Sequence, residues 1–198
     1  MIKKLLNPFA YFDEKILFII GLFSHFFFTY IAKITESFFP DFLSIKKNGI
    51  SYSYLDLLYQ NTRNLAIAIL LFYILGKIIN NRTRIIDIVN VVLISRIAYY
   101  IVFITDFIPI VNKSMDKVLK GITANNLEVL HEASTMIVIV IVAFIAIFFL
   151  CVMFYYLYIG FKTVTNMKSI KQVLAFIAVL LFIIISTSIL SLLIPQKI

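Results

Sequence analysis

The residue whose type and position most strongly indicate a chemical role in this sequence is an arginine inside an apolar run. Arg96 lies within residues 85–110, a stretch rich in Ile and Val. On insertion scales an arginine near the centre of a membrane helix costs about 2.5–3.5 kcal/mol, whereas the apolar residues around Arg96 contribute roughly −4 to −8 kcal/mol. The run can therefore carry Arg96 into a membrane, and we expect neighbouring helices to shelter its guanidinium from lipid.

The acidic residues of the same run are too far away to neutralise Arg96. Asp87 and Asp106 lie nine and ten residues from it, which is about 13 and 15 Å along a helix. The predicted partner is therefore a hydroxyl, a carbonyl, water or a lipid phosphate. The polar candidates on apolar runs are Ser24, Thr29, Asn90, Ser186, Thr187 and Ser188. Two interpretations stay open: Arg96 ties helices together or reaches the interface, or it handles a ligand, lipid or ion.

Four further polar residues, Asp87, Arg84, Asn90 and His25, are candidates for helix pairing or ligand binding. Asp87 lies three residues after Arg84, so the two side chains can pair at the start of a helix, where a carboxylate also suits the helix dipole. Asn90 follows one turn later. His25 lies in the middle of another apolar run, where a hydrogen-bonded core histidine is the first interpretation and a proton relay or ligand the second.

No catalytic or metal-binding pattern is present in the sequence. His131 and Glu132 resemble the start of a zinc-protease helix motif, but Thr135 stands where the second histidine would be. A Gly-rich phosphate loop, a nucleophile elbow and a pair of carboxylates within an apolar run are all missing. We therefore expect no metal, no cofactor and no enzymatic activity.

The composition places these residues in a membrane protein. Hydrophobic residues make up 62% of the 198 residues, charged residues only 14%, and the mean hydropathy is +1.02. These values exclude an ordinary soluble domain. The net charge of +8 comes from Lys and Arg residues scattered over every loop, which argues against a nucleic-acid surface and for membrane topology.

The fold class predicted from the apolar runs is an all-α bundle of five transmembrane helices forming a single domain. A helix needs about 20 apolar residues to cross the hydrocarbon core, and no run shows the alternation of a barrel strand. An aromatic patch at Phe38, Phe39 and Phe42 lies between the first two spans, and we expect it at the membrane interface. The spans are expected at about 16–32, 62–79, 85–110, 135–161 and 173–194.

The distribution of basic residues predicts the orientation. Segments 1–15, 77–84 and 162–172 hold nine Lys or Arg residues in 34 residues, and segments 33–64, 111–134 and 195–198 hold eight in 60. Because short cytoplasmic loops collect Lys and Arg, the amino terminus is expected inside and the carboxyl terminus outside.

Several short motifs resemble bacterial members of the Yip family, which is named for the Ypt/Rab-interacting membrane proteins. They are Asn7-Pro8-Phe9 with Tyr11-Phe12-Asp13-Glu14, then Gly76-Lys77, and the stretch from Arg82-Thr83-Arg84-Ile85-Ile86-Asp87 to Ser95-Arg96. The resemblance covers nearly the whole chain and implies five spans with a cytosolic amino terminus. Ala98 stands where many relatives have a proline. The long amino-terminal region of eukaryotic members is not matched, so the resemblance does not imply a small-GTPase partner.

Two functional hypotheses follow. The first is a non-enzymatic Yip-type protein of the bacterial cytoplasmic membrane, which acts in membrane organisation or trafficking through contacts with lipids, other membrane proteins or itself. Under this hypothesis Arg96→Leu leaves insertion intact and allows a rise in stability. The alternative is a small transporter or channel subunit in which Arg96, Asp87 and His25 line a polar path.

Overall fold

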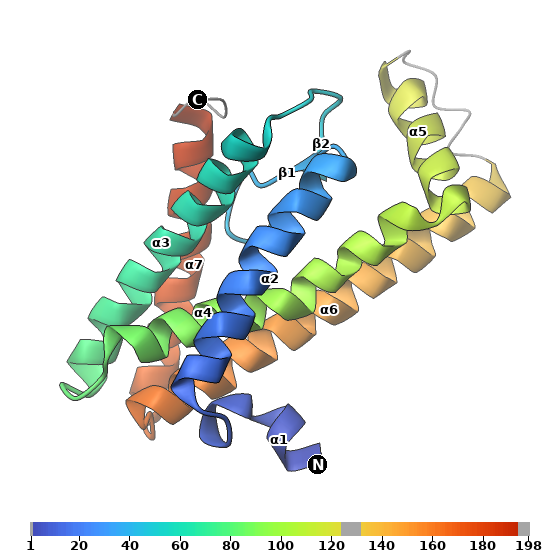
Figure 1. Cartoon of the computed structure of the whole chain (residues 1–198). Coiled ribbons are helices and arrows are strands. Elements are labelled where there is room, and N and C mark those ends of the chain that lie inside the picture. Colours follow the sequence, from blue (N-terminus) through green and yellow to red (C-terminus); the bar gives the residue numbers. More distant parts are fainter. Residues whose placement is uncertain (1, 124–131, 194–198) are drawn as a thin grey trace.

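Among residues 2–123 and 132–193, five helices are long and apolar enough to cross a membrane, which confirms the predicted fold class and a multi-pass membrane protein. The computed structural model in Figure 1 describes residues 2–123 and 132–193. Each span lies close to its predicted position. The spans are α2 (Glu14–Ile34), α3 (Tyr54–Ile79), Ile85–Phe107, α6 (Ala133–Thr165) and α7 (Ile170–Leu193).

Side-chain caps explain why two spans begin earlier than their apolar runs. Asp13 accepts a hydrogen bond from the backbone N–H of Lys15 at 2.8 Å and so starts α2. Ser53 and Asp56 form a reciprocal capping box at the start of α3, eight residues before the predicted span. Such caps satisfy amide groups that the first helical turn leaves without partners.

The third span changes its geometry before it ends. It consists of α4 (Ile85–Tyr100) and the 3-10 helix η2 (Ile101–Phe107). Pro109 then begins a separate helix, α5 (Pro109–Thr123), because proline is tolerated in the first turn of a helix but not in its interior. The predicted span 85–110 therefore ends earlier, and the expected loop 111–134 begins with a helix.

Helix α4 is the central element of the bundle. It packs mainly against α6 and α2, and it also contacts α3, which in turn lies against α7. Figure 1 shows α4 and α6 side by side, crossing the bundle obliquely. In an apolar 18-residue stretch of each span, 61% of the residues of the third span (α4 with η2) but only 11% of the residues of α6 are buried. Arg96 therefore lies on the most enclosed helix.

The close approach of α2 to α4 depends on a glycine. A Cβ atom added at Gly21 would lie 2.7 Å from the Cβ atom of Leu93. Atoms so close to the backbone cannot move aside without moving the helix. Gly21 therefore lets α2 cover the side of α4 on which Leu93 lies.

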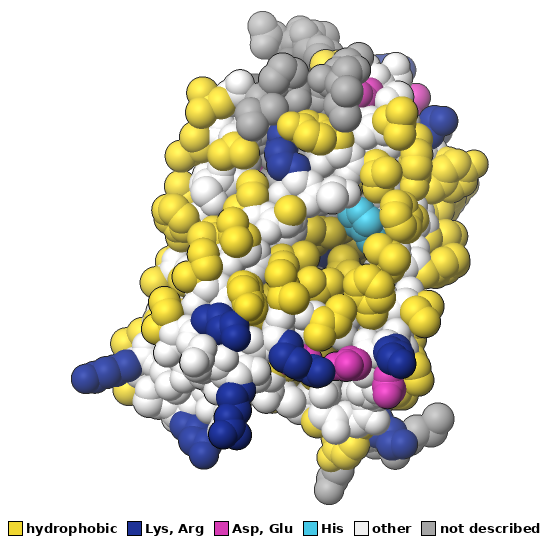
Figure 2. All heavy atoms as spheres, turned by 60° about the vertical axis from the view of Figure 1, so that its left-hand side comes forward, with side chains coloured by type: hydrophobic (Ala, Val, Ile, Leu, Met, Phe, Trp, Pro, Cys, Tyr) yellow, Lys and Arg dark blue, Asp and Glu magenta, His cyan; other side chains and the backbone are white. Residues whose placement is uncertain are grey.

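The three segments that the basic residues assign to the inner side of the membrane lie together at one end of the bundle, which we call the basic end. Arg84 pairs with Glu14, and Asn7 donates to the hydroxyl of Thr163 at 3.0 Å. These contacts join residues 1–15, 77–84 and 162–172. Figure 2 shows Lys and Arg side chains gathered at this lower end, beneath a broad hydrophobic belt. The grouping of the segments is confirmed, and the side of the membrane stays a prediction.

The amino-terminal segment docks onto α6 through a second glycine. This segment comprises α1 (Ile2–Leu6) and the 3-10 helix η1 (Pro8–Ala10). The ring of Phe9 lies so close to Gly160 that an added Cβ atom would meet its Cε2 at 2.6 Å. The packing therefore leaves no room for a larger residue at position 160.

Gly160→Ala should release the amino-terminal segment without unfolding the five spans. Overpacking of this kind costs about 1–3 kcal/mol, so tryptic cleavage after Lys4 should become roughly ten-fold faster or more. Limited proteolysis of the purified protein measures this rate. Phe9→Ala, which removes the same contact from the other side, should give a similar increase. Unchanged cleavage in both variants would contradict the docking.

Candidate functional site: the buried arginine and the re-entrant segment

The chain between α2 and α3 folds back into the bundle instead of lying on its surface. We call residues 35–47 the re-entrant segment. Its two ends are joined by the antiparallel pair β1 (Ser37–Phe38) and β2 (Lys46–Lys47), and its tip descends between the helices (Figure 1). Phe39 and Phe42 at the tip are both 0% exposed. The expectation that this aromatic patch lies at the interface is wrong for these two residues, because the tip is enclosed by helices.

Helix α3 supplies partners for the backbone of the segment. The side-chain oxygen of Gln60 accepts from the N–H of Phe39 at 3.1 Å, and the side-chain amide of Asn64 donates to the Phe39 carbonyl at 3.0 Å. Arg63 donates to the carbonyl of Pro40 at 3.5 Å. Irregular backbone at membrane depth is tolerated only where protein or water satisfies its polar groups. The polar residues of α3 perform that role here.

Two other spans hold the tip at Phe42. The hydroxyl of Thr187 on α7 accepts from the N–H of Phe42 at 3.1 Å, and the guanidinium of Arg96 on α4 donates to the Phe42 carbonyl. The carboxylate of Asp41 accepts from the backbone N–H groups of residues 43 and 44, both at 2.8 Å. The backbone of the tip is thus bonded to three spans and to its own side chain.

The guanidinium of Arg96 is enclosed by aromatic rings. Its Cζ atom lies 4.9 Å from the ring centre of Tyr100, 5.3 Å from that of Phe42 and 5.8 Å from that of Tyr99. The side chain is 1% exposed. These four residues are called the Arg96 cluster below. The predicted shelter for the guanidinium is confirmed, and rings compensate part of the charge through cation–π attraction.

The partner of Arg96 belongs to a predicted class but not to the predicted residues. A carbonyl was among the expected partner types, yet it comes from the re-entrant segment. No Asp or Glu in residues 2–123 and 132–193 lies within ion-pair distance of Arg96. Of the predicted residues, Thr187 accepts from the N–H of Phe42, the residue whose carbonyl accepts from Arg96. Asn90 bonds to the backbone of Glu14 instead. On this geometry we expect Arg96→Leu to lower the stability instead of raising it, since the variant would leave the Phe42 carbonyl without this donor.

His25 is a hydrogen-bonded core residue, as its first interpretation predicts. It is 5% exposed, and its Nε2 lies 3.0 Å from the hydroxyl of Thr62. One turn further on α2, Thr29 accepts from the side-chain amide of Asn61 at 3.0 Å. The Asn61 oxygen in turn accepts from the hydroxyl of Tyr100 at 2.9 Å. A line of polar contacts thus runs from α2 through α3 to the Arg96 cluster.

Asp87, Arg84 and Asn90 form a separate group at the basic end. Arg84 pairs with Asp87 at 2.8 Å, as their spacing predicts, and also with Glu14. The carboxylates of Asp87 and Glu14 hold the pKa of the Arg84 guanidinium above its usual value. The side chain of Asn90 donates to the backbone carbonyl of Glu14 at 2.9 Å. The structure therefore does not bring Asp87 to Arg96, and these three residues join α4 to α2.

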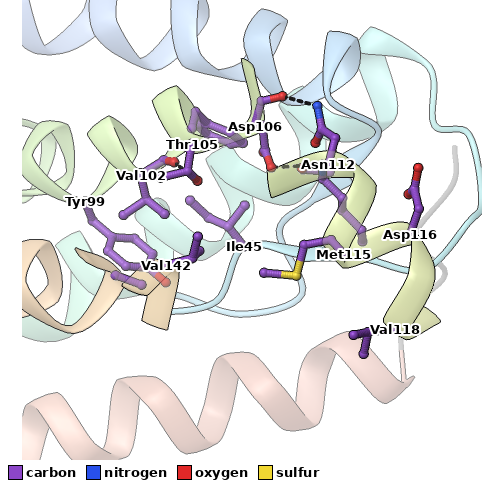
Figure 3. Close-up of a pocket in the computed structure, with 14 residues that line it drawn as sticks. Ile45, Tyr99, Val102, Thr105, Asp106, Asn112, Met115, Asp116, Val118 and Val142 are labelled. Atoms are coloured by element: carbon purple, nitrogen blue, oxygen red, sulfur yellow. Dashed lines mark hydrogen bonds and ion pairs between the residues drawn. The ribbon is translucent and has the colours of Figure 1, made fainter. Parts of the chain in front are cut away.

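A pocket of about 410 Å³ adjoins the Arg96 cluster on the side of α5 and α6. Figure 3 shows Tyr99, Val102 and Val142 at one end of it and Asn112, Asp106 and Asp116 at the other. Its walls come from the re-entrant segment, the end of α4 at Tyr99, η2, α5 and α6. The pocket therefore has an apolar interior with a polar rim, and it depends on two elements that the apolar runs did not predict.

The rim of this pocket ties the re-entrant segment to η2 and α5. The ammonium of Lys47 pairs with Asp106 at 2.9 Å, and Asn112 donates to the backbone carbonyl of Asp106 at 2.6 Å. The ring of Tyr99 lines the pocket and also lies over Arg96. A molecule bound in the pocket would thus touch a ring that shields the guanidinium.

The part of the chain that the structure describes contains no group of three metal-binding side chains. Thr135 donates to the carboxylate of Glu132 at 2.9 Å, and Lys117 pairs with the same carboxylate at 2.7 Å. The hydrogen bonds from Lys117 and Thr135 hold the pKa of Glu132 below its usual value. His131 lies outside the described residues. Glu132 thus joins α5 to the start of α6.

Comparisons with protein-family models, curated proteins and solved structures gave no match. The Yip resemblance therefore stays a prediction based on short motifs. The function has to follow from the geometry of the bundle and of the re-entrant segment.

Proposed function

We propose that this chain is a non-enzymatic integral membrane protein of Yip type that acts in membrane organisation, trafficking or protein interaction within the bilayer. The observation that carries this proposal is the use of the buried polar side chains. Gln60, Asn64, Thr187 and Arg96 each bond to the backbone of the chain's own re-entrant segment. These side chains stabilise the fold of the chain itself. The protein would therefore act through contacts of its outer surface with lipids and other helices.

The surface of α6 supports action through lateral contacts. Its most apolar stretch has a mean hydropathy of 3.5, the highest of the five spans. Large exposed side chains recur at helical spacing along one face, and Cys151 is exposed on the same helix. The residues of this stripe are Ile137, Ile141, Phe144, Phe148 and Tyr155. A stripe of this kind can contact acyl chains, another membrane protein or a second copy of the chain.

The proposed location is the bacterial cytoplasmic membrane, with the amino terminus inside. The nine Lys and Arg residues of segments 1–15, 77–84 and 162–172 support this orientation, since those segments meet at one end of the bundle.

The single cysteine provides a direct test of lateral contacts. A benzophenone maleimide attached to Cys151 should, on illumination in native membranes, give discrete protein adducts that an excess of unlabelled protein diminishes. Cys151→Ser serves as the control for labelling elsewhere. Adducts with lipid alone, at every protein density, would overturn the proposal.

A second candidate function, a small transporter or channel subunit, is favoured by the line of buried polar groups from His25 to Arg96. The connected part of this line runs from the backbone carbonyl of His25 through Thr29, Asn61 and Tyr100 to Arg96, and the re-entrant segment would close a polar path around it. Cysteines placed singly at positions 94–98 in a Cys151→Ser background separate the two candidates. Labelling of one helix face by a polar thiol reagent would support a path, and labelling of none would support the packed bundle.

A further inference from the structure

An apolar groove opens between the amino-terminal segment, α2, α4 and α6. Its volume is about 350 Å³, and Lys4 and Tyr156 are the polar side chains among its lining residues. Leu5 and Phe12 form its wall at the basic end. The rest of the wall comes from the spans, through Ile20 on α2, Ile97 on α4 and Phe149 and Val152 on α6.

The amino-terminal segment is held in place as part of this groove. The hydroxyl of Tyr156 donates to the backbone carbonyl of Leu5 at 2.9 Å, and Asn7 donates to Thr163 at 3.0 Å. The Phe9 ring fills the space that Gly160 leaves open. These contacts fix Lys4 at the mouth of the groove.

The groove has the dimensions of a hydrocarbon chain. Along the third span it extends from Ile94 on α4 to Ile101 at the start of η2, and on α6 from Phe149 to Tyr156, which is about 10 Å along each span. A helix of about 10 Å diameter and the same length would occupy roughly 800 Å³, far more than the groove offers. A single acyl chain is therefore a better occupant than another helix.

The charge at the mouth selects the headgroup. Lys4 is exposed, and it lies at the basic end with the other Lys and Arg residues of that end. The two acidic residues nearest in sequence are already engaged, since Asp13 caps α2 and Glu14 pairs with Arg84. An ammonium at the end of an apolar groove complements a phosphate attached to an acyl chain.

We infer that this groove binds one acyl chain of an anionic phospholipid, with the lipid phosphate next to the ammonium of Lys4. The inference does not depend on the lateral contacts proposed for α6, because the stripe used there and the groove have different residues. The occupant comes from the bilayer itself and enters from the lipid-facing side of the groove.

The sequence contains no tryptophan, which makes a site-specific fluorescence test possible. Phe149→Trp places a reporter in the groove, and Phe144→Trp places one on the exposed surface of the same helix, where Phe144 is 69% exposed. Each variant is reconstituted as the full chain in mixtures of brominated phosphatidylglycerol with phosphatidylcholine, and in the reverse mixtures. Quenching then reports which lipid lies beside each reporter.

At Phe149→Trp we expect about a five-fold preference for phosphatidylglycerol, the effect of one lysine near an anionic headgroup. At Phe144→Trp the preference should be close to one. Val152→Trp, a second reporter in the groove, should repeat the result if Phe149→Trp folds poorly. Equal preferences at the groove and the surface positions would overturn the inference.

The charge of Lys4 is tested in the same system. Lys4→Gln should reduce the preference at Phe149→Trp to the surface value. Lys168→Gln, which removes an exposed lysine from the same end of the bundle, should leave it unchanged. If Lys4→Gln has no effect, or if both variants reduce the preference equally, the lysine does not select the headgroup and the inference fails.

Discussion

Arg96→Leu should destabilise the folded protein by about 2 kcal/mol or more and release the re-entrant segment. The variant leaves the buried carbonyl of Phe42 without its donor, and an unsatisfied buried group costs about 1–3 kcal/mol. It also removes the cation–π attraction to Phe42, Tyr99 and Tyr100, worth about 0.5–2 kcal/mol in total. Removal of a buried charge offsets part of this loss, and the balance favours destabilisation.

Thermal or denaturant unfolding in a mild detergent measures the Arg96→Leu effect. Arg96→Lys keeps the charge but loses the planar group that stacks on the rings, so its stability should lie between that of the parent protein and that of Arg96→Leu. Arg84→Leu is the matched control, because its ion pairs lie at the solvent-exposed end of the bundle, where water screens them, and their loss should change the stability much less. An Arg96→Leu protein as stable as the parent would mean that Arg96 does not stabilise the bundle or its re-entrant segment.

The second large effect is expected for Asn64→Leu. This variant removes the donor to the buried carbonyl of Phe39 and should cost about 1–3 kcal/mol. The leucine has a similar size, so the loss reports the hydrogen bond more than a cavity. Unfolding measurements on the variant give the size of the effect. The re-entrant segment should also become accessible to protease after Lys46 or Lys47.

Combining Asn64→Leu with Arg96→Leu gives a sharper result than either variant alone. Both side chains hold the same segment, so the second substitution should destabilise the protein less once the first has released it. The loss of stability in the double variant should therefore be smaller than the sum of the losses in the two single variants. Asn64→Leu combined with Arg84→Leu should be additive, because these residues hold different elements. Additive losses in both pairs would show that Asn64 and Arg96 do not act on one segment.

The spans and the short-range pairs could be predicted from the sequence. Five apolar runs predict five helices because a helix satisfies its backbone polar groups through its own hydrogen bonds, as the membrane interior requires. Arg84 and Asp87 pair because they are three residues apart on one helix. His25 bonds within the core because a lone histidine in an apolar run needs a partner. Each of these features depends on residues close together in the chain or on overall hydrophobicity.

The re-entrant segment could not be predicted by the same reasoning. Its partners are distant in sequence: Phe42 bonds to Arg96 and Thr187, which lie 54 and 145 residues away. Hydrophobicity alone placed Phe39 and Phe42 at the interface, because aromatic residues are common there. One pattern could have indicated the segment. Gln60, Asn61 and Asn64 share one face of α3, and polar amides facing a bundle interior require buried partners.

The pocket beside α5 was missed for a related reason. The end of the third span depends on Pro109, and the apolar run continues past it. The prediction from hydrophobicity therefore extended the span to residue 110. A new helix begins at Pro109 instead, because proline fits the first turn of a helix but not its interior. The pair of Lys47 and Asp106 then joins a segment and a helix end that are both absent from a simple five-span outline.

Arg96 holds the tip of the re-entrant segment at membrane depth through its bond to the Phe42 carbonyl. Solid-state NMR on the full chain in lipid bilayers tests it directly, through the dipolar coupling between the carbonyl carbon of Phe42 and the guanidinium nitrogens of Arg96. The two groups are hydrogen-bonded, so strong dephasing is expected, and it should disappear in Arg96→Lys. If the parent protein shows no coupling while the five helices are intact, the segment lies elsewhere and Arg96 has another role.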